Sequence, residues 1–340
     1  MELKALTRTL CAVCAPSGDE DALHGVIRDY LADIADEISV DALGNLLAVK
    51  RGSNADAGSV MLSAHMDEVG LMVTAVEDGF LRFAPLGGVD ARMLPAREVR
   101  VLSDPPVNGV IDTLPPHLLK PGESENAVSV DRLCIDTGLS HEEAETLCPP
   151  GTRVVLPGGV EELMNGSLCG RALDNRSCAA IAMKAFELLA AEERRGDLVL
   201  LLTSQEEVGS RGAAVGAFGL RPDAALVLDV THAVTPDASD VPCRCGKGAA
   251  IGIGPNMNPS VTRRLIALAE EKDIPWQPEP LPGSSGTDAA VLQLTEAGLA
   301  TGLISLPLKY MHTPSEVVRV EDMQSVLRLV TAFVTSMGEV

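Results

Sequence analysis

Imidazole and carboxylate side chains follow the apolar runs of this sequence in a recurring way. Each of four runs with the composition of a buried strand is followed by at least one side chain that can bind a metal ion. These side chains are His65, Asp67, Glu206, Glu207, Asp229 and His312. Asp174 is a further candidate because it stands just before a strongly helical segment. Imidazole nitrogen and carboxylate oxygen suit zinc, cobalt or manganese, so the pattern indicates metal chemistry.

The four apolar runs have the composition of strands that are buried on both faces of a parallel sheet. They occupy residues 60–64, 198–203, 224–228 and 302–306. Ligands in open α/β sheets bind outside the carboxyl ends of the strands, so one edge of a sheet can collect the side chains that follow them. A single histidine is often structural and an acidic residue often caps a helix, so the set carries more information than any one member.

The charges of this set are balanced by two divalent cations. With Asp174, Glu207 and Asp229 ionised, two divalent ions leave a net charge of about +1, which one bridging hydroxide neutralises. Without cations the same carboxylates would crowd together at like charge, which is costly in a cleft. Glu206 and Glu207 also have a second interpretation, as an acidic pair on a solvated loop.

The composition disfavours several classes of partner. The chain has 340 residues, which at about 150 residues per domain favours two domains with a substantial core. Hydrophobic residues make up 46% of the chain, which excludes widespread disorder, and the net charge of −21 disfavours nucleic acid and anionic membranes as partners. Aromatic residues make up only 2%, so no stacking platform for single-stranded nucleic acid is expected.

Features that would direct the chain to a membrane or an oxidising compartment are not found in the sequence. No segment approaches the ~20 apolar residues that span a bilayer, and the acidic start does not resemble a signal peptide. The pairs Cys11 with Cys14 and Cys243 with Cys245 lack the matching second pair of a zinc finger. The eight cysteines are therefore expected to be ordinary reduced thiols in a cytoplasmic protein.

The pattern of elements changes twice along the chain. Helical stretches at 3–14 and 19–36 come first, and Ser17 with Glu20 has the spacing of a capping box for the second. Short β-like runs broken by Gly and Pro then extend to about residue 155. The remainder alternates strand-like runs with helical segments, at 177–193, 260–272 and 321–337. This order predicts an α/β sheet covered by helices, with a β-rich domain inserted into it.

Six segments of the sequence occur in an order that is characteristic of one enzyme family. They are Ala15–Gly18, Ala64–Gly70, Pro115–Leu118, Leu173–Arg176, Gln205–Ala213 and Met311–Glu316. Over nearly its whole length the chain resembles the co-catalytic metallo-aminopeptidases of peptidase family forty-two, the glutamyl aminopeptidase and tetrahedral (TET) aminopeptidase group. The segment Gln205–Ala213 is long enough to make the resemblance specific.

The resemblance implies a metal-binding role for five of the candidates. Asp174 would bridge two divalent ions, His65 and Asp229 would complete one metal site, and Glu207 and His312 would complete the other. Two ions per chain are expected, with zinc as the first choice and cobalt or manganese as alternatives.

The resemblance also implies how the reaction proceeds. A water shared by the two cations would lose a proton near neutral pH and attack the peptide carbonyl, with Glu206 as the general base. Asp67 would orient the ring of His65. Asp174 and Asn175 would be joined by a cis peptide bond, and Asn175 departs from the Asp that is common in the family at this position.

For the fold, the resemblance implies a zinc-peptidase-like α/β/α sandwich with a mixed central sheet and an inserted small β-barrel. Residues 1–67 and 165–340 would form the catalytic domain, and residues 68–164 would form an inserted domain that mediates dimerisation. Dimers would assemble into a tetrahedral dodecamer. His117, in the inserted domain, is expected to be structural or to lie at a subunit contact.

We therefore expect a metal-dependent aminopeptidase that acts on peptides and has no nucleic-acid or membrane partner. Thr287 and Asp288 lie where the family has a segment lining the substrate cleft, although the same residues can be interpreted as the start of a helix. Two other functions stay open. One is a related two-metal deacylase or carboxypeptidase acting on N-acyl amino acids or dipeptides, and the other is a non-catalytic binding or assembly protein.

Overall fold

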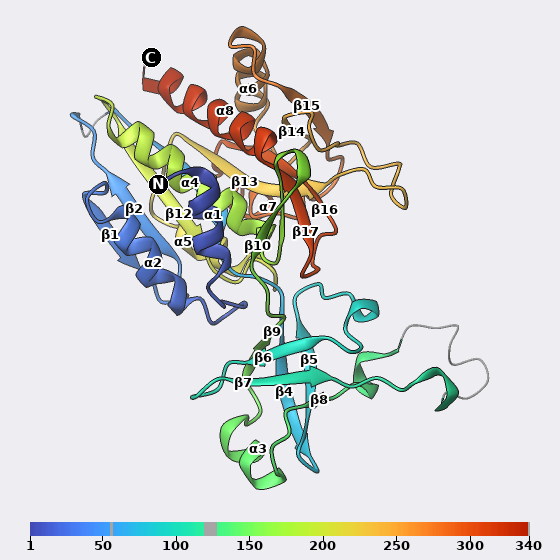
Figure 1. Cartoon of the computed structure of the whole chain (residues 1–340). Helices are drawn as coiled ribbons and strands as arrows, with labels where there is room; N and C mark the ends of the chain where they lie inside the picture. Colours follow the sequence, from blue (N-terminus) through green and yellow to red (C-terminus); the bar gives the residue numbers. More distant parts are fainter. Residues whose placement is uncertain (55–56, 119–127, 339–340) are drawn as a thin grey trace.

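A helix-covered sheet and a separate β-barrel make up the fold (Figure 1). The computed structural model describes residues 1–54, 57–118 and 128–338. The predicted α/β class, with a mixed central sheet and an inserted barrel, is confirmed. In the part of the chain that is described, no helix is both long and apolar enough to cross a membrane.

The large sheet has eleven strands, and its centre is parallel. The four predicted apolar runs form this centre, in the spatial order β12 (Asp197–Thr203), β3 (Ser59–His65), β13 (Ala224–His232) and β16 (Thr301–Lys309). Beyond β12 lie β2 (Leu46–Lys50) and β1 (Glu37–Val40), and beyond β16 lie β17 (Glu316–Arg319), β11 (Ser167–Gly170) and β10 (Val160–Leu163). Strands β14 (Ala249–Ile253) and β15 (Trp276–Pro280) branch from β16.

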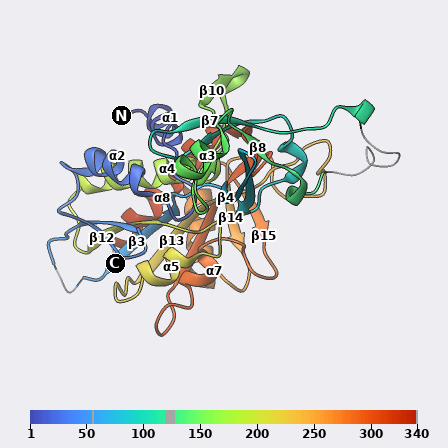
Figure 2. The same ribbon diagram turned by 90° about the horizontal axis from the view of Figure 1, so that it is seen from below.

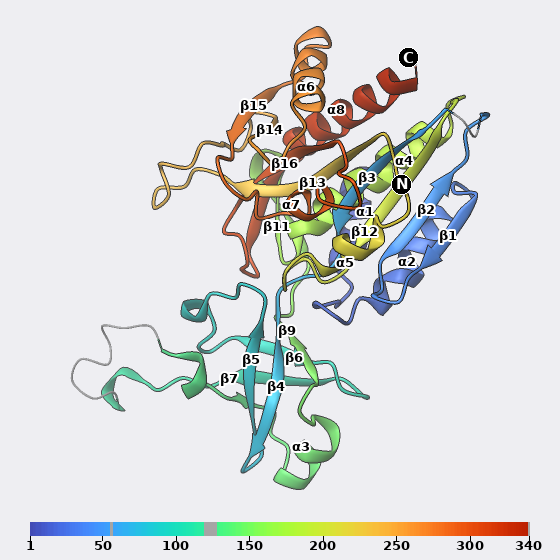
Figure 3. The ribbon, with the colours of Figure 1, turned by 180° about the vertical axis from the view of Figure 1, so that it is seen from behind.

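Helices cover both faces of this sheet (Figure 2). The larger core lies under α1 (Leu3–Cys11), α2 (Asp21–Leu31), α4 (Leu173–Ala190), α6 (Pro259–Glu271) and α8 (Val320–Gly338). The opposite face, seen in Figure 3, packs against the short helices α5 (Arg211–Gly216) and α7 (Ala289–Leu292).

The alternation of side chains along each central strand explains the continuous apolar runs. In β12, Leu200 and Leu202 belong to the larger core, whereas Val199 and Leu201 belong to the core under α5 and α7. Since successive side chains of a strand point to opposite faces, a strand covered on both faces needs apolar residues at every position. Strands β12 and β3 end level with each other, at Thr203 and His65, whereas β13 and β16 continue their pairing to His232 and Leu308.

The inserted lobe is a closed barrel between β3 and β10 of the chain. Its strands, in order around the barrel, are β4 (Gly70–Glu77), β5 (Phe80–Leu86), β8 (Ile135–Asp136), β7 (Val107–Ile111), β6 (Glu98–Val101) and β9 (Arg153–Val155). A separate apolar core fills it. Helix α3 (His141–Leu147) belongs to this lobe and begins with a capping box formed by Ser140 and Glu143.

A buried arginine ties the start of α4 to the rest of the sheet domain. The Arg176 side chain is fully buried and forms an ion pair with Glu68, whose Oε1 lies 3.0 Å from Arg176 Nη2. Burial alone would raise the pKa of Glu68, but the guanidinium groups of Arg176 and Arg171 lower it below its usual range. Arg176 also donates to the carbonyl oxygens of Leu10, Val13, Ala15 and Met66.

We predict that Arg176→Met lowers the free energy of unfolding by about 3–5 kcal/mol, because Glu68 would be left buried without one of its cationic partners. Urea denaturation measures this change. Lys4→Met is the control, since Lys4 pairs with Glu162 on the exposed surface and the substitution should cost less than about 1 kcal/mol. Equal effects of the two substitutions would contradict the role given to Arg176.

Candidate metal centre

The five side chains that are expected to bind metal meet at one edge of the large sheet. His65 is the last residue of β3, and Asp229 lies in the neighbouring strand β13. Glu207 follows β12, His312 follows β16, and Asp174 stands at the start of α4. Three of the five therefore lie at or beyond the carboxyl ends of parallel strands, where ligands bind in such sheets, and Asp229 lies inside the adjacent strand β13.

The five side chains form two groups of three that share Asp174. His65, Asp174 and Asp229 make one group, Asp174, Glu207 and His312 make the other, and within each group the ligand atoms lie within 4.8 Å of one another. Asp174 Oδ1 lies 3.2 Å from His65 Nε2, and Asp174 Oδ2 lies 3.4 Å from His312 Nε2. Each oxygen of one carboxylate thus faces a different group, as a bridging ligand requires.

The remaining separations within the groups are similarly short. His65 Nε2 lies 3.8 Å from Asp229 Oδ1, and His312 Nε2 lies 3.3 Å from Glu207 Oε2. The peptide bond between Asp174 and Asn175 is cis, which confirms the expectation drawn from the sequence.

The electrostatics of the site favour the binding of cations. Burial raises the pKa of Glu207 and Asp229 well above the usual range, and the neighbouring charge of Asp174 acts in the same direction. Burial also disfavours ionised Asp174, but hydrogen bonds from His312 and His65 lower the pKa of this carboxyl below its usual range. Cations in both groups would relieve the repulsion and keep all three carboxylates ionised, so this donor set fits two divalent ions.

Asp229 occupies a different place in its strand from the one predicted. The sequence predicts a strand that ends at Leu228, and this boundary is wrong, because β13 continues to His232. Beyond Asp229 the strand keeps pairing with β16. A polar side chain therefore interrupts the apolar run without ending the strand.

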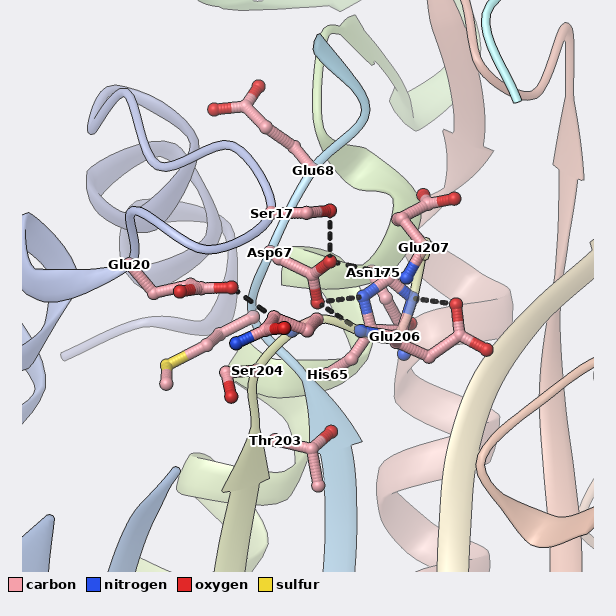
Figure 4. A network of polar contacts seen from close by, with 12 residues as sticks. Ser17, Glu20, His65, Asp67, Glu68, Asn175, Thr203, Ser204, Glu206 and Glu207 are labelled. Carbon is pink, nitrogen blue, oxygen red and sulfur yellow. Dashed lines mark hydrogen bonds and ion pairs between the residues drawn. The ribbon is translucent and has the colours of Figure 1, made fainter. Parts of the chain in front are cut away.

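Asp67 contacts the Ser17 hydroxyl, the His65 ring and the loop that follows β12 (Figure 4). Its carboxylate is fully buried, and Asp67 Oδ1 lies 3.4 Å from His65 Nδ1. The same carboxylate accepts hydrogen bonds from the Ser17 hydroxyl at 2.6 Å and from the backbone N–H groups of Glu206 and Glu207 at 3.0 and 3.2 Å. Asp67 is therefore placed to orient the His65 ring and to hold the loop that follows β12.

The capping box predicted at Ser17 and Glu20 is wrong. Glu20 itself precedes α2, and no side chain caps this helix. The Ser17 hydroxyl bonds to Asp67 instead, while Glu20 Oε1 accepts hydrogen bonds from the backbone N–H groups of Gly18 and Gln205 at 2.8 and 3.0 Å. Both side chains thus support the metal centre, a long-range role that the local spacing could not reveal.

Glu206 lies beside both metal-binding groups and belongs to neither. Its Oε2 lies 4.0 Å from His65 Nε2, and its Oε1 accepts a hydrogen bond from the Ser210 hydroxyl at 3.1 Å. Burial raises the pKa of Glu206 to about 7; the charge of His65 opposes this shift, and that of Asp288 adds to it. A carboxyl group with such a pKa can exchange protons near neutral pH.

Thr287 and Asp288 precede the short helix α7, as the helix-start interpretation expects. The Thr287 hydroxyl accepts a hydrogen bond from the backbone N–H of Ala289 at 3.3 Å. Asp288 is buried and accepts a hydrogen bond from the hydroxyl of Thr203, at the end of β12, at 2.5 Å. Asp288 thus lies beside the strand that leads into Glu206.

His117 and the cysteines do not belong to either group of potential ligands. His117 is exposed in a single turn of 3₁₀ helix in the barrel lobe. The eight cysteines, all of which are in the described part of the chain, are unpaired and take no part in either metal-binding group.

A glycine of the barrel lobe touches the metal centre and was missed by the sequence analysis. Gly88 follows β5, and its carbonyl oxygen lies 2.9 Å from His312 Nδ1. This contact fixes the ring with Nε2 directed at Asp174 and Glu207. A Cβ on Gly88 would lie 2.7 Å from His312 Nδ1, so no larger residue fits without moving the ring. The adjacent pair Gly87 and Gly88 is the only sequence signal for this contact.

Comparison with known proteins shows that the chain is similar to several aminopeptidases. The sequence model of the M42 glutamyl aminopeptidase family matches residues 44–329. A lysyl aminopeptidase of Pyrococcus furiosus is 35% identical over 319 residues, which cover 91% of this chain and 90% of that protein. The TET aminopeptidase of a thaumarchaeon from marine sediment superimposes with a TM-score of 0.92 at 30% identity, covering 98% of this chain and 95% of that one.

One further solved structure bears on assembly. The Pyrococcus horikoshii TET1 peptidase, which can assemble into a tetrahedron or a large octahedral shell, superimposes with a TM-score of 0.85 at 29% identity. The match covers 97% of this chain and 98% of that one.

We predict that Gly88→Ala weakens the binding of one of two zinc ions by about 10- to 100-fold, because the new Cβ displaces the His312 ring. Calorimetric titration of the metal-free protein measures both affinities. Gly159→Ala is the control, since a Cβ there has no neighbour within 4 Å. Two tight sites in Gly88→Ala would contradict this role of the barrel lobe.

Proposed function

The chain belongs to the M42 glutamyl aminopeptidase family, and we propose that the metal centre gives it a two-metal aminopeptidase activity. Membership makes the chain a hydrolase of peptide bonds. The observation that carries the two-metal proposal is the sharing of Asp174 by two groups of potential ligands.

The proposed ligands divide between two divalent cations. His65, Asp174 and Asp229 would hold one ion, and Asp174, Glu207 and His312 would hold the other. Imidazole and carboxylate donors without thiolate favour zinc, with cobalt or manganese as alternatives. These residues would hold cations that supply Lewis-acid chemistry, which polarises a scissile carbonyl and makes a water more acidic.

Glu206 is proposed as the general base. Because Glu206 belongs to neither group, its carboxylate would not be occupied as a metal ligand and could receive a proton from water and return it to the leaving amine. Asp67 supports this role because it accepts the backbone N–H of Glu206 and so fixes the start of the side chain. The same oxygen, Asp67 Oδ1, lies 3.4 Å from His65 Nδ1, so one atom links the proposed base to the His65 ring.

The proposed substrate is a peptide with a free N-terminal amine. Glu206, an acidic group beside the centre that is not a proposed ligand, could hold such an amine, and coordination of the amine to a cation is a second route. Thr287 and Asp288 are proposed to line the cleft for the N-terminal residue. The contact of Asp288 with Thr203 supports this assignment, because it brings the segment before α7 to the strand end that leads into Glu206.

We also propose a homo-oligomer built from dimers, with a tetrahedral dodecamer as the assembled form. The support comes from the TET structures, one of which assembles into a tetrahedron or an octahedral shell. The barrel lobe, residues 68–164, is the proposed dimerisation domain, and its exposed apolar side chains include Phe80, Val110 and Leu114. A cytoplasmic location is proposed because the eight cysteines are unpaired.

Chelation should abolish hydrolysis of aminoacyl anilides, and added zinc or cobalt should restore it, because the ligands alone cannot polarise the carbonyl. Peptides with an acetylated N-terminus should not be hydrolysed, whereas their free counterparts should. Assays with the anilides test the first statement. Chromatographic assays of the two peptide series test the second. Turnover of the acetylated series would favour the alternative deacylase activity instead.

Glu206→Gln should lower kcat by at least about 100-fold while two ions stay bound, because the amide cannot accept the proton. Steady-state kinetics and elemental analysis of the same sample separate the two effects. Glu161→Gln, an exposed substitution in β10, is the control. Undiminished activity in Glu206→Gln would disprove the assignment of the base.

A further inference from the structure

Glu316, the first residue of β17, is a buried carboxylate that contacts two of the proposed ligands through their backbones. Its side chain is enclosed, with 2% of the residue exposed. Glu316 Oε1 accepts a hydrogen bond from the backbone N–H of His312 at 2.8 Å. Glu316 Oε2 accepts one from the backbone N–H of Asp174 at 3.0 Å. One carboxylate thus joins two segments that are far apart in the chain.

The two segments need such a connection because neither is held by regular structure at the ligand. His312 lies in the connection between β16 and β17 and has a φ of 61°, in the left-handed region that few residues other than glycine adopt. Asp174 has non-helical backbone angles although it stands at the start of α4, and Ala172 before it has a φ of 55°. Such conformations persist only where surrounding contacts hold them.

We propose that Glu316 is a positioning residue that sets the separation of Asp174 and His312 and thereby builds the metal site formed with Glu207. The inference rests on the proposed two-metal function. Glu316 holds two of the three ligands of this site by their backbones, but only Asp174 in the other site. Its loss therefore affects the two ions unequally.

The contacts on His312 show why backbone positioning is a separate requirement. The Gly88 carbonyl orients the imidazole ring, whereas Glu316 fixes the residue that carries it. Asp67 holds the loop after β12 in a similar way, because its carboxylate accepts hydrogen bonds from the backbone N–H groups of Glu206 and Glu207. Two buried carboxylates thus hold the backbone of the centre from two sides.

Asp322 provides a matched control for the chemistry of Glu316. It is also buried, and its two carboxylate oxygens accept hydrogen bonds from the backbone N–H groups of Gly246 and Gly248 at 2.6 and 2.7 Å. Neither donor belongs to a proposed ligand. Asp322→Asn and Glu316→Gln each replace one acceptor oxygen by an amide NH₂ group. In both variants a buried backbone N–H then faces another hydrogen-bond donor and loses its acceptor.

The experiment is a zinc titration of the metal-free full-length proteins, followed by calorimetry and by elemental analysis after dialysis. The wild-type chain and Asp322→Asn should each bind two ions with the same two affinities. Glu316→Gln should keep one ion and bind the other about 10- to 100-fold more weakly. His312→Ala is the reference variant, because it removes a proposed ligand of this site and should weaken the binding of the same ion. Glu316→Asp should resemble Glu316→Gln, because the shorter side chain cannot reach both N–H groups.

Each outcome decides the proposal. Two ions bound to Glu316→Gln with wild-type affinity would overturn it, and so would an equal loss in Asp322→Asn, which would indicate a general loss of stability. If Glu316→Gln fails to fold, the same criteria apply to Glu316→Asp. A wild-type chain that binds fewer than two ions would contradict the two-metal function itself, and the inference would fall with it.

Discussion

Buried carboxylates crowd around Asp174, and this crowding is the constraint that governs the rest of the structure. Glu207 and Asp229 approach Asp174 from separate strands, where burial and like charge oppose their ionisation. Two imidazoles face the shared carboxylate from opposite sides. Such an arrangement is favourable when positive charge occupies the space between the ligands, so metal binding and the stability of this edge of the sheet are coupled.

Buried charges hold the backbone around the centre in place. Asp67 fixes the loop after β12, and Glu68 with Arg176 ties the segment after β3 to the start of α4. Glu20 reaches the same loop from the N-terminal segment by accepting the backbone N–H of Gln205. The backbone N–H groups of this loop lie outside the sheet and cannot form strand-to-strand hydrogen bonds. Buried carboxylates accept their hydrogen bonds instead. Ser17 and Glu20 are consequently part of the candidate site although neither is a proposed ligand.

The sequence was most informative where local pattern and final structure coincide. The central strands were predictable because burial on both faces demands continuous apolar runs, and the gathering of the polar residues that follow those runs was predictable because the carboxyl ends of parallel strands lie at one edge of the sheet. The roles of Ser17 and Glu20 were not predictable from their spacing, because both side chains bond to residues brought near by the fold. Gly88 shows the same limit, since its partner His312 lies in the other lobe.

The most direct test of the central claim is anomalous diffraction from a crystal of the zinc-loaded protein, recorded at the zinc absorption edge. The account predicts two peaks, with one oxygen of Asp174 directed at each of them. Five side chains should surround the pair: His65, Asp174, Glu207, Asp229 and His312. A single peak, or two peaks of which either lies away from Asp174, would contradict it.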